Sequence, residues 1–399
     1  MSVSRLAEMP GIGVDRVGAA ADVLAAANPK LLRLENLDCD LRPPPAAIEA
    51  TRRAIEEDAA NSYLPFLGQH ALRRAVARHV GRLSGVAYDP ERQCIITAGG
   101  LSGCLIALLA LLEPGDEVVL TDPTYVGMLN RVRLAGGRPR LVPFLRDGAG
   151  CQSAWRLDLD ALRRAFTLRS RGRTGARTRV AFIMSPSMPS GAVLNRAEWE
   201  AIAALCRRHD AWLLYNAAME RILYDGRPHI HPASLPGMAQ RTIMVGSVSK
   251  EYRMIGWRVG WLVGPESVMR DIALASISDV VVPVGIAQEA ARAALEAPER
   301  DVAEAVAEWQ RRRDVIVAEL ADLPLVPAAG SWSMLLDVGA LGHQAAAASA
   351  LLLERGAIAA TPMDGWGVVN GPQFVRFVFS NEPVARLRGI GDRVRRSLT

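Results

Sequence analysis

The segment RTIMVGSVSKEYRMIGWRVGWLV, residues 241–263, contains two short apolar runs separated by a polar loop. The runs Arg241–Val248 and Val259–Val263 are rich in β-branched and aromatic side chains, which is typical of buried strands. The loop between them carries Lys250 and Arg258. We therefore expect a lysine and an arginine in a loop between two strands.

The pattern around this segment alternates strands with amphipathic helices. Helical spacing near 3.6 occurs at residues 101–112, 159–166 and 196–208. Alternation of this kind predicts βαβ units and an α/β fold, with a mostly parallel, seven-stranded central sheet flanked by helices. The seven strands are expected at Cys94–Ala98, Glu117–Asp122, Arg138–Phe144, Arg179–Met184, Trp212–Tyr215, Arg241–Val248 and Val259–Val263.

The C-terminal third of the chain follows a different pattern. A helical stretch at residues 285–323 precedes possible strands at 331–337 and 374–379 and helices at 342–355 and 383–397. This order predicts a smaller C-terminal α+β domain. We expect three parts: an N-terminal arm that packs on the small domain or a partner subunit (1–45), a large domain (46–285) and a small domain (286–399).

Composition narrows the class of protein. The chain has 399 residues, half of them hydrophobic, so it can bury a large core. Its longest wholly apolar run, residues 104–112, is too short to span a bilayer, and the N-terminus lacks an apolar signal core. The five cysteines are an odd number without close pairing or metal-ligand spacing. We expect no membrane partner and a reducing cytoplasm.

The net charge of +5 raises the question of nucleic-acid binding. The densest basic stretch, residues 163–179, includes Arg169, Arg171, Arg173 and Arg177 among Ser, Thr and Gly, without stacking aromatic residues. A solvated loop explains it better than a nucleic-acid site.

Lysine is nearly absent from this chain. Of the 47 Lys and Arg residues, only Lys30 and Lys250 are lysines. Arginine cannot form an imine because its guanidinium stays protonated in proteins. A lysine retained at position 250 therefore indicates that a primary amine is needed there.

The segment around Lys250 resembles the cofactor-lysine region of class I/II aminotransferases, enzymes of fold type I that use pyridoxal 5′-phosphate (PLP). In that family a serine lies three residues before the lysine and an arginine eight residues after it, as Ser247 and Arg258 do here. The resemblance implies that Lys250 forms the internal aldimine with PLP while Ser247 and Arg258 hold the phosphate. A dianionic phosphate suits these donors.

Further motifs follow in the family's order. Glycines in the segment 97–103 let helix N-terminal amides approach a phosphate, and the resemblance assigns Gly100 and Leu101 to that contact. Tyr125 would stack on the pyridine ring, in a catalytic position. Tyr63 matches a tyrosine that reaches the phosphate of the neighbouring subunit, which implies a homodimer with shared sites. Arg376 matches the arginine that binds the α-carboxylate of an amino-acid substrate.

Three cofactor-facing positions depart from the family pattern. Met188 replaces an asparagine that donates to O3′ of the cofactor, Asn216 replaces the aspartate beside the pyridine nitrogen, and Met219 replaces a tyrosine. A carboxylate keeps the pyridine nitrogen protonated, whereas neutral Asn216 supplies only a hydrogen bond. The two methionines offer O3′ no donor, which should raise the pKa of the aldimine. These changes should weaken ordinary transamination.

The leading hypothesis is a PLP-dependent aminotransferase-like enzyme that acts on an L-α-amino acid through a Lys250 aldimine. The alternative is a non-transaminating PLP enzyme that catalyses elimination, cyclisation, racemisation or decarboxylation. A cofactor-binding regulator or an inactive relative is a third class, and Asn216 can also be an altered residue. His229 and His231 form an incomplete metal-ligand set. Cys39 either faces substrate or packs in the core.

Overall fold

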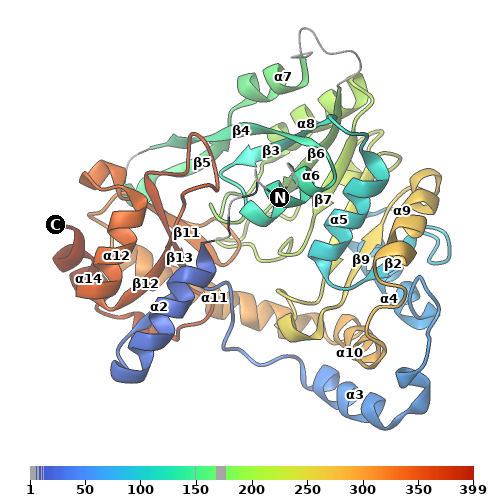
Figure 1. Ribbon diagram of the computed structural model, residues 1–399, viewed down its shortest axis with the longest axis horizontal. Helices are drawn as coiled ribbons and strands as arrows, with labels where there is room; N and C mark the ends of the chain where they lie inside the picture. Colours follow the sequence, from blue (N-terminus) through green and yellow to red (C-terminus); the bar gives the residue numbers. More distant parts are fainter. Residues whose placement is uncertain (1–5, 7–8, 10, 12, 149, 168–176) are drawn as a thin grey trace.

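The computed structural model describes residues 6, 9, 11, 13–148, 150–167 and 177–399. Within these ranges the chain forms two β-sheets, each covered by helices (Figure 1). Of the basic stretch considered above, Arg169, Arg171 and Arg173 lie outside the described residues. No helix in the described ranges combines the length and the apolar character that a bilayer crossing needs.

The larger sheet has eight strands in the order β2-β9-β8-β7-β6-β3-β4-β5. The five strands from β8 to β4 run parallel, and antiparallel pairs lie at both edges. The strand bounds are β2 Cys94–Thr97, β9 Gly260–Val263, β8 Thr242–Ser247, β7 Trp212–Asn216, β6 Thr178–Met184, β3 Glu117–Asp122, β4 Arg138–Asp147 and β5 Ala154–Leu157.

All seven expected strands of this sheet are present, and β5 adds an eighth. β5 pairs antiparallel with β4 and alternates exposed with buried residues along its four positions. Four residues after a glycine-containing turn are too short a pattern to separate from a loop by sequence alone.

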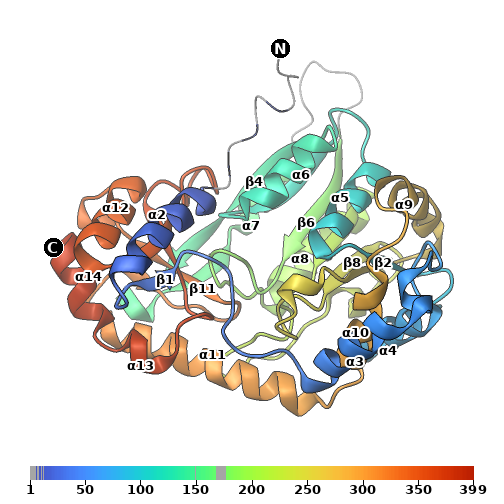
Figure 2. The same ribbon diagram turned by 60° about the horizontal axis from the view of Figure 1, so that its bottom comes forward.

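Helices cover the larger sheet in groups (Figure 2). The apolar helix α5 (Gly100–Leu111) packs against α6 (Val126–Leu134) and α9 (Glu266–Asp279), while α7 (Leu159–Thr167) packs against α8 (Arg196–Arg208). Helix α8 begins with a capping box in which the Asn195 side chain accepts from the Glu198 backbone N–H and the Glu198 carboxylate accepts from the Asn195 N–H.

The second sheet has five strands in the order β1-β12-β13-β11-β10. The two strands expected here, β11 and β13, are present, while β1, β10 and β12 were not anticipated. β1, from the N-terminal segment, runs parallel to β12. The N-terminal segment therefore completes a sheet otherwise made by the C-terminal part. The strand bounds are β1 Leu32–Leu34, β12 Ile358–Pro362, β13 Phe374–Val378, β11 Ser333–Asp337 and β10 Leu325–Val326.

Helices around the second sheet are α2 (Val14–Ala27), α12 (Ala345–Gly356), α13 (Val384–Leu387) and α14 (Ile390–Leu398). Figure 1 shows α2 beside these C-terminal helices, although it lies more than 300 residues away along the chain. The expected helix at residues 383–397 is two helices, because Gly389 adopts φ +78° between them.

The helical stretch at residues 285–323 is also two helices rather than one. α10 (Gly285–Leu295) packs against α3 (Pro45–Glu56) and α4 (His70–Ser84). Pro298 then caps α11 (Glu299–Glu319), which runs along the base of the molecule in Figure 2. Proline cannot continue the preceding helix because it lacks an N–H donor. The domain boundaries at residues 45 and 285 stay predictions.

Candidate active site

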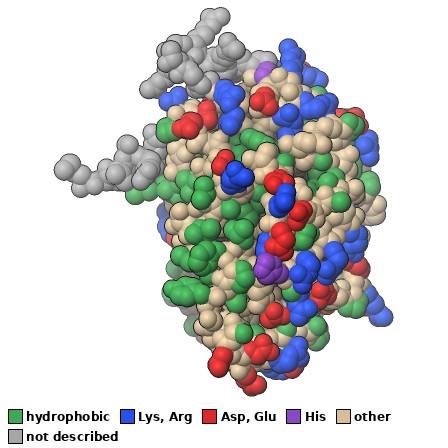
Figure 3. Space-filling view, turned by 90° about the vertical axis from the view of Figure 1, so that its right-hand side faces the viewer, with side chains coloured by type: hydrophobic (Ala, Val, Ile, Leu, Met, Phe, Trp, Pro, Cys, Tyr) green, Lys and Arg blue, Asp and Glu red, His purple; other side chains and the backbone are tan. Residues whose placement is uncertain are grey.

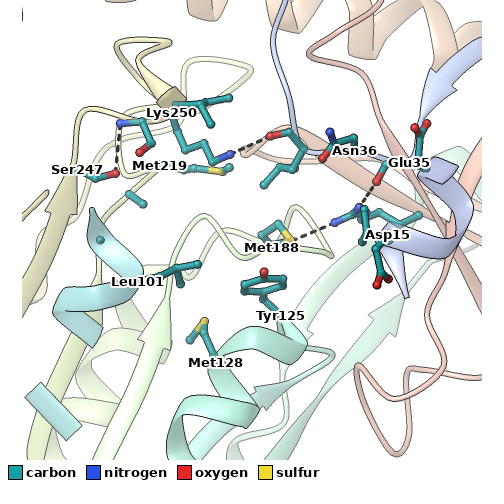
Figure 4. A pocket seen from close by; sticks show the side chains of 18 of the residues that line it. Asp15, Glu35, Asn36, Leu101, Tyr125, Met128, Met188, Met219, Ser247 and Lys250 are labelled. Carbon is teal, nitrogen blue, oxygen red and sulfur yellow. Dashed lines mark hydrogen bonds between the residues drawn. The ribbon is translucent and has the colours of Figure 1, made fainter. Parts of the chain in front are cut away.

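A cavity of about 820 Å³ lies at the carboxyl ends of the parallel strands, where open α/β sheets commonly bind ligands. Met184, Asn216 and Ser247, the last residues of β6, β7 and β8, line it. The first turn of α5 and residues of α2 and the segment after β1 complete its wall. Figure 4 shows this cavity from close by, with the side of Lys250 and Ser247 opposite that of Asp15 and Glu35.

Lys250 projects into the cavity from the loop after β8. Its Nζ donates to the Leu37 carbonyl at 2.9 Å and lies 5.0 Å from the ring centroid of Trp332 (Figure 4). Burial, with a smaller contribution from the neighbouring Arg258 and Arg376 guanidinium groups, lowers the pKa of Lys250 to about 8, against 10.5 for an ordinary lysine. The Asp38 carboxylate raises the pKa of Lys250 and so offsets part of this decrease. The amine is therefore far more often neutral and nucleophilic at neutral pH than a surface lysine.

Ser247, Gly100 and Arg258 converge on one end of the cavity. Gly99 precedes α5 with φ +87°, and a Cβ there would lie 2.6 Å from a guanidinium nitrogen of Arg258. Only glycine leaves room for the guanidinium at the N-terminus of α5. Arg258 has no carboxylate partner in the described chain. A guanidinium without a carboxylate partner, a hydroxyl and helix N-terminal amides form a site that fits a phosphate.

Asn216 is buried at the end of β7 and faces the cavity. Its Oδ1 accepts a hydrogen bond from the Ala218 backbone N–H at 3.2 Å, whereas its Nδ2 has only the sulfur of Met128, 4.0 Å away. The amide orientation follows from this network, because a backbone N–H requires an acceptor. Asn216 therefore presents a donor rather than an acceptor to the cavity.

Two methionines flank Asn216 at the positions that depart from the family pattern. Met219 accepts from the Ser331 hydroxyl through sulfur at 3.0 Å, and Met188 lies 3.5 Å from a guanidinium nitrogen of Arg376. Both side chains line the cavity and are buried. Neither can donate a hydrogen bond to a ligand.

Tyr125 lines the cavity and packs against the ring of Trp366. Tyr125 precedes α6, and its ring centroid lies 5.4 Å from that of Trp366 at an interplanar angle of 59°. A Cβ at Gly127 would lie 2.3 Å from the Tyr125 ring, so glycine is required there. The exposed side of Tyr125 offers a planar surface to a ring-shaped ligand.

Arg376 is fully buried in β13 and makes no ion pair with any described residue. It donates to the Glu35 carbonyl and to the Thr361 hydroxyl, while its Nε has no partner. Burial lowers the pKa of Arg376 to about 10. A buried guanidinium without a counter-ion is costly, and a ligand carboxylate would remove that cost.

The structure brings ten of the eleven sequence-predicted site residues to this cavity. The exception is Tyr63, which is 86% exposed and lies outside it. Cys39 does not line the cavity either; it packs against the core, and burial raises the pKa of its thiol to about 11. His229 pairs with Glu220 at 3.0 Å. Among the described residues, no group of three or more His, Cys, Asp or Glu could hold a metal ion.

Sequence reasoning missed several residues of the cavity. Asp15 and Glu35 reach it from the N-terminal segment. Trp332 and Trp366 do not line the cavity themselves but contact Lys250 and Arg376, which do. Local pattern gave no signal for these residues, because each is brought to the cavity by pairing or packing between distant segments.

Comparison with known proteins identifies the family. The sequence profile of "Aminotransferase class I and II" matches residues 29–390. The arginine–pyruvate transaminase of Pseudomonas aeruginosa is 34% identical over 344 residues, which cover 85% of this chain and 83% of that protein. N-succinyldiaminopimelate aminotransferase from Mycobacterium tuberculosis superposes with a TM-score of 0.88 at 30% identity and 99% coverage of both chains.

Aspartate aminotransferase from Thermus thermophilus with maleate superposes with a TM-score of 0.87 at 29% identity, over 100% of each chain. Three features agree with a PLP enzyme of fold type I: the family fold, the buried lysine in the cavity, and the candidate phosphate site formed by Ser247, Arg258 and the N-terminus of α5. This chain therefore belongs to the class I and II aminotransferases, the PLP-dependent enzymes that its sequence resembles.

Proposed function

We propose that this protein carries PLP covalently on Lys250 and acts on an L-α-amino acid, with amino-group transfer as its reaction. One observation carries the proposal: the buried Lys250 amine, with its lowered pKa, shares a cavity with the candidate phosphate site and with the Arg376 guanidinium, which has no counter-ion among the described residues. These three features are a nucleophile for the cofactor aldehyde, a site for its phosphate and a receptor for the substrate α-carboxylate.

When bound, PLP supplies an aldehyde that condenses with amines and a conjugated ring that withdraws electrons from the substrate Cα. Ser247, the N-terminal amides of α5 and Arg258 would hold its phosphate. Tyr125 would pack against its ring. Arg376 would orient the substrate by a bidentate contact with the α-carboxylate. The Lys250 amine, once released by the substrate, would hold and move the proton at Cα.

The alternative is a PLP reaction other than transamination, namely elimination, cyclisation, racemisation or decarboxylation. The orientation of Asn216 supports it. An N–H donor directed at the pyridine nitrogen favours the unprotonated nitrogen, which withdraws electrons less strongly than a protonated one. Met188 and Met219 add no donors near O3′. Reactions that need less electron withdrawal by the ring suit this environment better.

A single-turnover experiment separates the two reactions. Purified holoenzyme is incubated with each proteinogenic amino acid in the absence of a keto acid, and the cofactor is then extracted and quantified. Accumulation of pyridoxamine phosphate supports transamination. Release of ammonia, CO₂ or a cyclised or racemised product, with PLP retained, supports the alternative. Turnover with none of the amino acids tested would instead support an inactive relative.

We also propose that the protein is a homodimer in which Tyr63 reaches the neighbouring active site. Tyr63 and Phe66 are exposed, as are Leu274, Val281 and Val284. A Cβ on Gly285 would lie 2.1 Å from the Ala60 carbonyl, so the segments 60–66 and 281–284 are neighbours. Figure 3 shows that hydrophobic side chains gather along one side of the face that it presents. Exposed apolar residues that lie together mark interaction surfaces.

Light scattering at micromolar concentration tests the dimer. Mixing inactive Lys250→Ala protein with Tyr63→Phe protein tests the shared site: a heterodimer in which one site has both native residues should recover activity. A monomer in solution would contradict the proposal.

We propose a cytoplasmic location as well, supported by the free thiols of Cys94, Cys104 and Cys206.

A further inference from the structure

The charges that line the cavity do not balance once the proposed ligands are in place. Four cationic side chains line it: Arg33, Lys250, Arg258 and Arg376. The proposed function assigns Lys250 to the cofactor, Arg258 to its phosphate and Arg376 to the substrate α-carboxylate. Only Arg33 remains to neutralise the acidic side chains of the cavity wall.

Arg33 forms ion pairs with two of these acidic residues. Its Nε and Nη2 donate to Glu35 Oε1 at 2.8 and 2.7 Å, and its Nη1 donates to Asp22 at 2.8 Å. All three guanidinium nitrogens thus have a carboxylate partner. A substrate with a side-chain carboxylate would find no free guanidinium here.

The acidic side chains of this wall outnumber its one remaining cation, Arg33. Asp15 lines the cavity and makes no hydrogen bond or ion pair with any described residue. Glu35 is fully buried, and its Oε2 has no hydrogen-bond partner although a buried carboxylate oxygen normally has one. With Asp15, Asp22 and Glu35 against Arg33, this wall retains two unneutralised negative charges.

The wall also leaves room for a long side chain. One face of α2 lines the cavity. Its residues there are spaced three or four positions apart, over two helical turns: Asp15, Gly18, Ala19 and Asp22. A Cβ on Gly18 would meet nothing within 4 Å, so this part of the helix surface is open. Figure 4 shows Asp15 on the side of the cavity opposite Lys250. A long substrate side chain that extends away from Lys250 would therefore approach Asp15.

We infer that the cavity selects α-amino acids with a cationic side chain, a guanidinium or an ammonium group, and that Asp15 is the residue that recognises this cation. The inference rests on the proposed function, because it takes Arg376 as the α-carboxylate receptor. A carboxylate that binds a guanidinium gains a charge-assisted hydrogen bond that a neutral isostere cannot provide.

L-arginine and L-citrulline form a matched pair for the test, since they differ in charge at the end of the side chain and little in shape. Dissociation constants for PLP-loaded protein are measured by calorimetry and by the change in cofactor absorbance. We expect arginine to bind at least about tenfold more tightly than citrulline. Asp15→Asn should remove most of that preference by weakening arginine, with citrulline unchanged. Asp15→Glu should retain it.

Asp271→Asn is the matched control, because Asp271 is an exposed aspartate on α9 outside the cavity. It should leave both dissociation constants unchanged, and thermal melting should show each variant folded. Equal affinity for arginine and citrulline, or an equal loss of both in Asp15→Asn, would overturn the inference. If no amino acid changes the cofactor absorbance, the proposed function fails as well. A response to neutral or acidic amino acids alone overturns only the cationic specificity.

Discussion

The guanidinium of Arg376 lies over the indole of Trp366, with Cζ 4.8 Å from the ring centroid. The same indole contacts the ring of Tyr125, so one buried side chain supports both the proposed carboxylate receptor and the proposed cofactor-stacking ring. Trp366 precedes a loop that is held in place by Asp122, whose carboxylate accepts from the backbone N–H groups of Val368, Val369 and Asn370.

Trp366→Leu should therefore weaken substrate binding more than catalysis. Loss of a desolvated cation–π contact of about 1–2 kcal/mol predicts a KM for the amino acid raised by about 5- to 30-fold. We expect kcat and the cofactor absorbance to change much less. Trp366→Phe retains an aromatic face and should restore part of the KM. Steady-state kinetics check this, and a change in kcat alone would refute the positioning role.

Lys250 and Lys30 allow an internally controlled test of the cofactor lysine, because they are the only lysines of the chain. Lys250→Ala should abolish the absorbance band of covalently bound PLP and lower turnover by about 10²–10⁴-fold or more. Lys30→Arg, a change at an exposed site, should alter neither. Borohydride reduction followed by peptide mapping should label the peptide that contains residue 250. A label on Lys30 alone would disprove the assignment.

Asn216→Asp tests the neutral environment of the pyridine nitrogen. The new carboxylate can still accept from the Ala218 N–H, while its charge should raise the pKa of that nitrogen by about 1–3 units. We expect transamination, measured as pyridoxamine phosphate formed per second, to rise by about tenfold or more. Asn216→Ser introduces no charge and should not increase it. ¹⁵N NMR of labelled cofactor gives an independent measure of ring protonation.

Cofactor uptake by the apoprotein should depend on pH through Lys250. Its pKa is lowered to about 8, so the neutral amine that attacks the PLP aldehyde is a minor species at pH 7 and the main species at pH 9. We expect the second-order rate constant for PLP binding to rise by about tenfold over this range and then level off. Stopped-flow absorbance checks it. A rate that kept rising to pH 10.5 would indicate an unperturbed lysine.

The same lowered pKa predicts how the stability of the apoprotein changes with pH. Between about pH 8 and 10.5 the unfolded lysine is protonated while the buried one is neutral, so the unfolded state binds more protons. The free energy of unfolding therefore gains a stabilising contribution from Lys250 as pH rises through this window. Lys250→Met should remove that contribution. Urea titrations of apoprotein and variant at pH 8 and 10 would measure the difference.

Much of the fold could be predicted from sequence because its strands carry local signals. Each of the seven expected strands of the large sheet is a run of apolar residues bounded by turns, and the capping box at Asn195 and Glu198 marks a helix start. β1, β10 and β12 were not predicted. β1 has three residues and β10 has two, which is too short for a periodic pattern, and β12 follows directly after helix α12. The break at Pro298 was missed because the apolar spacing continues on both sides.

The sequence by itself determined the reactive groups: one lysine beside a serine and an arginine, a neutral Asn216, and Met188 and Met219 in place of donors. Tertiary structure alone decided how these groups act. Lys250 meets the Leu37 carbonyl across 213 residues, and Arg376 meets the Glu35 carbonyl across 341. The pairing of β1 with β12 brings Glu35 and its neighbours to the cavity, and helix α2 adds Asp15. Local periodicity specifies which face of a strand is buried, whereas contacts between distant segments depend on how whole sheets and helices pack.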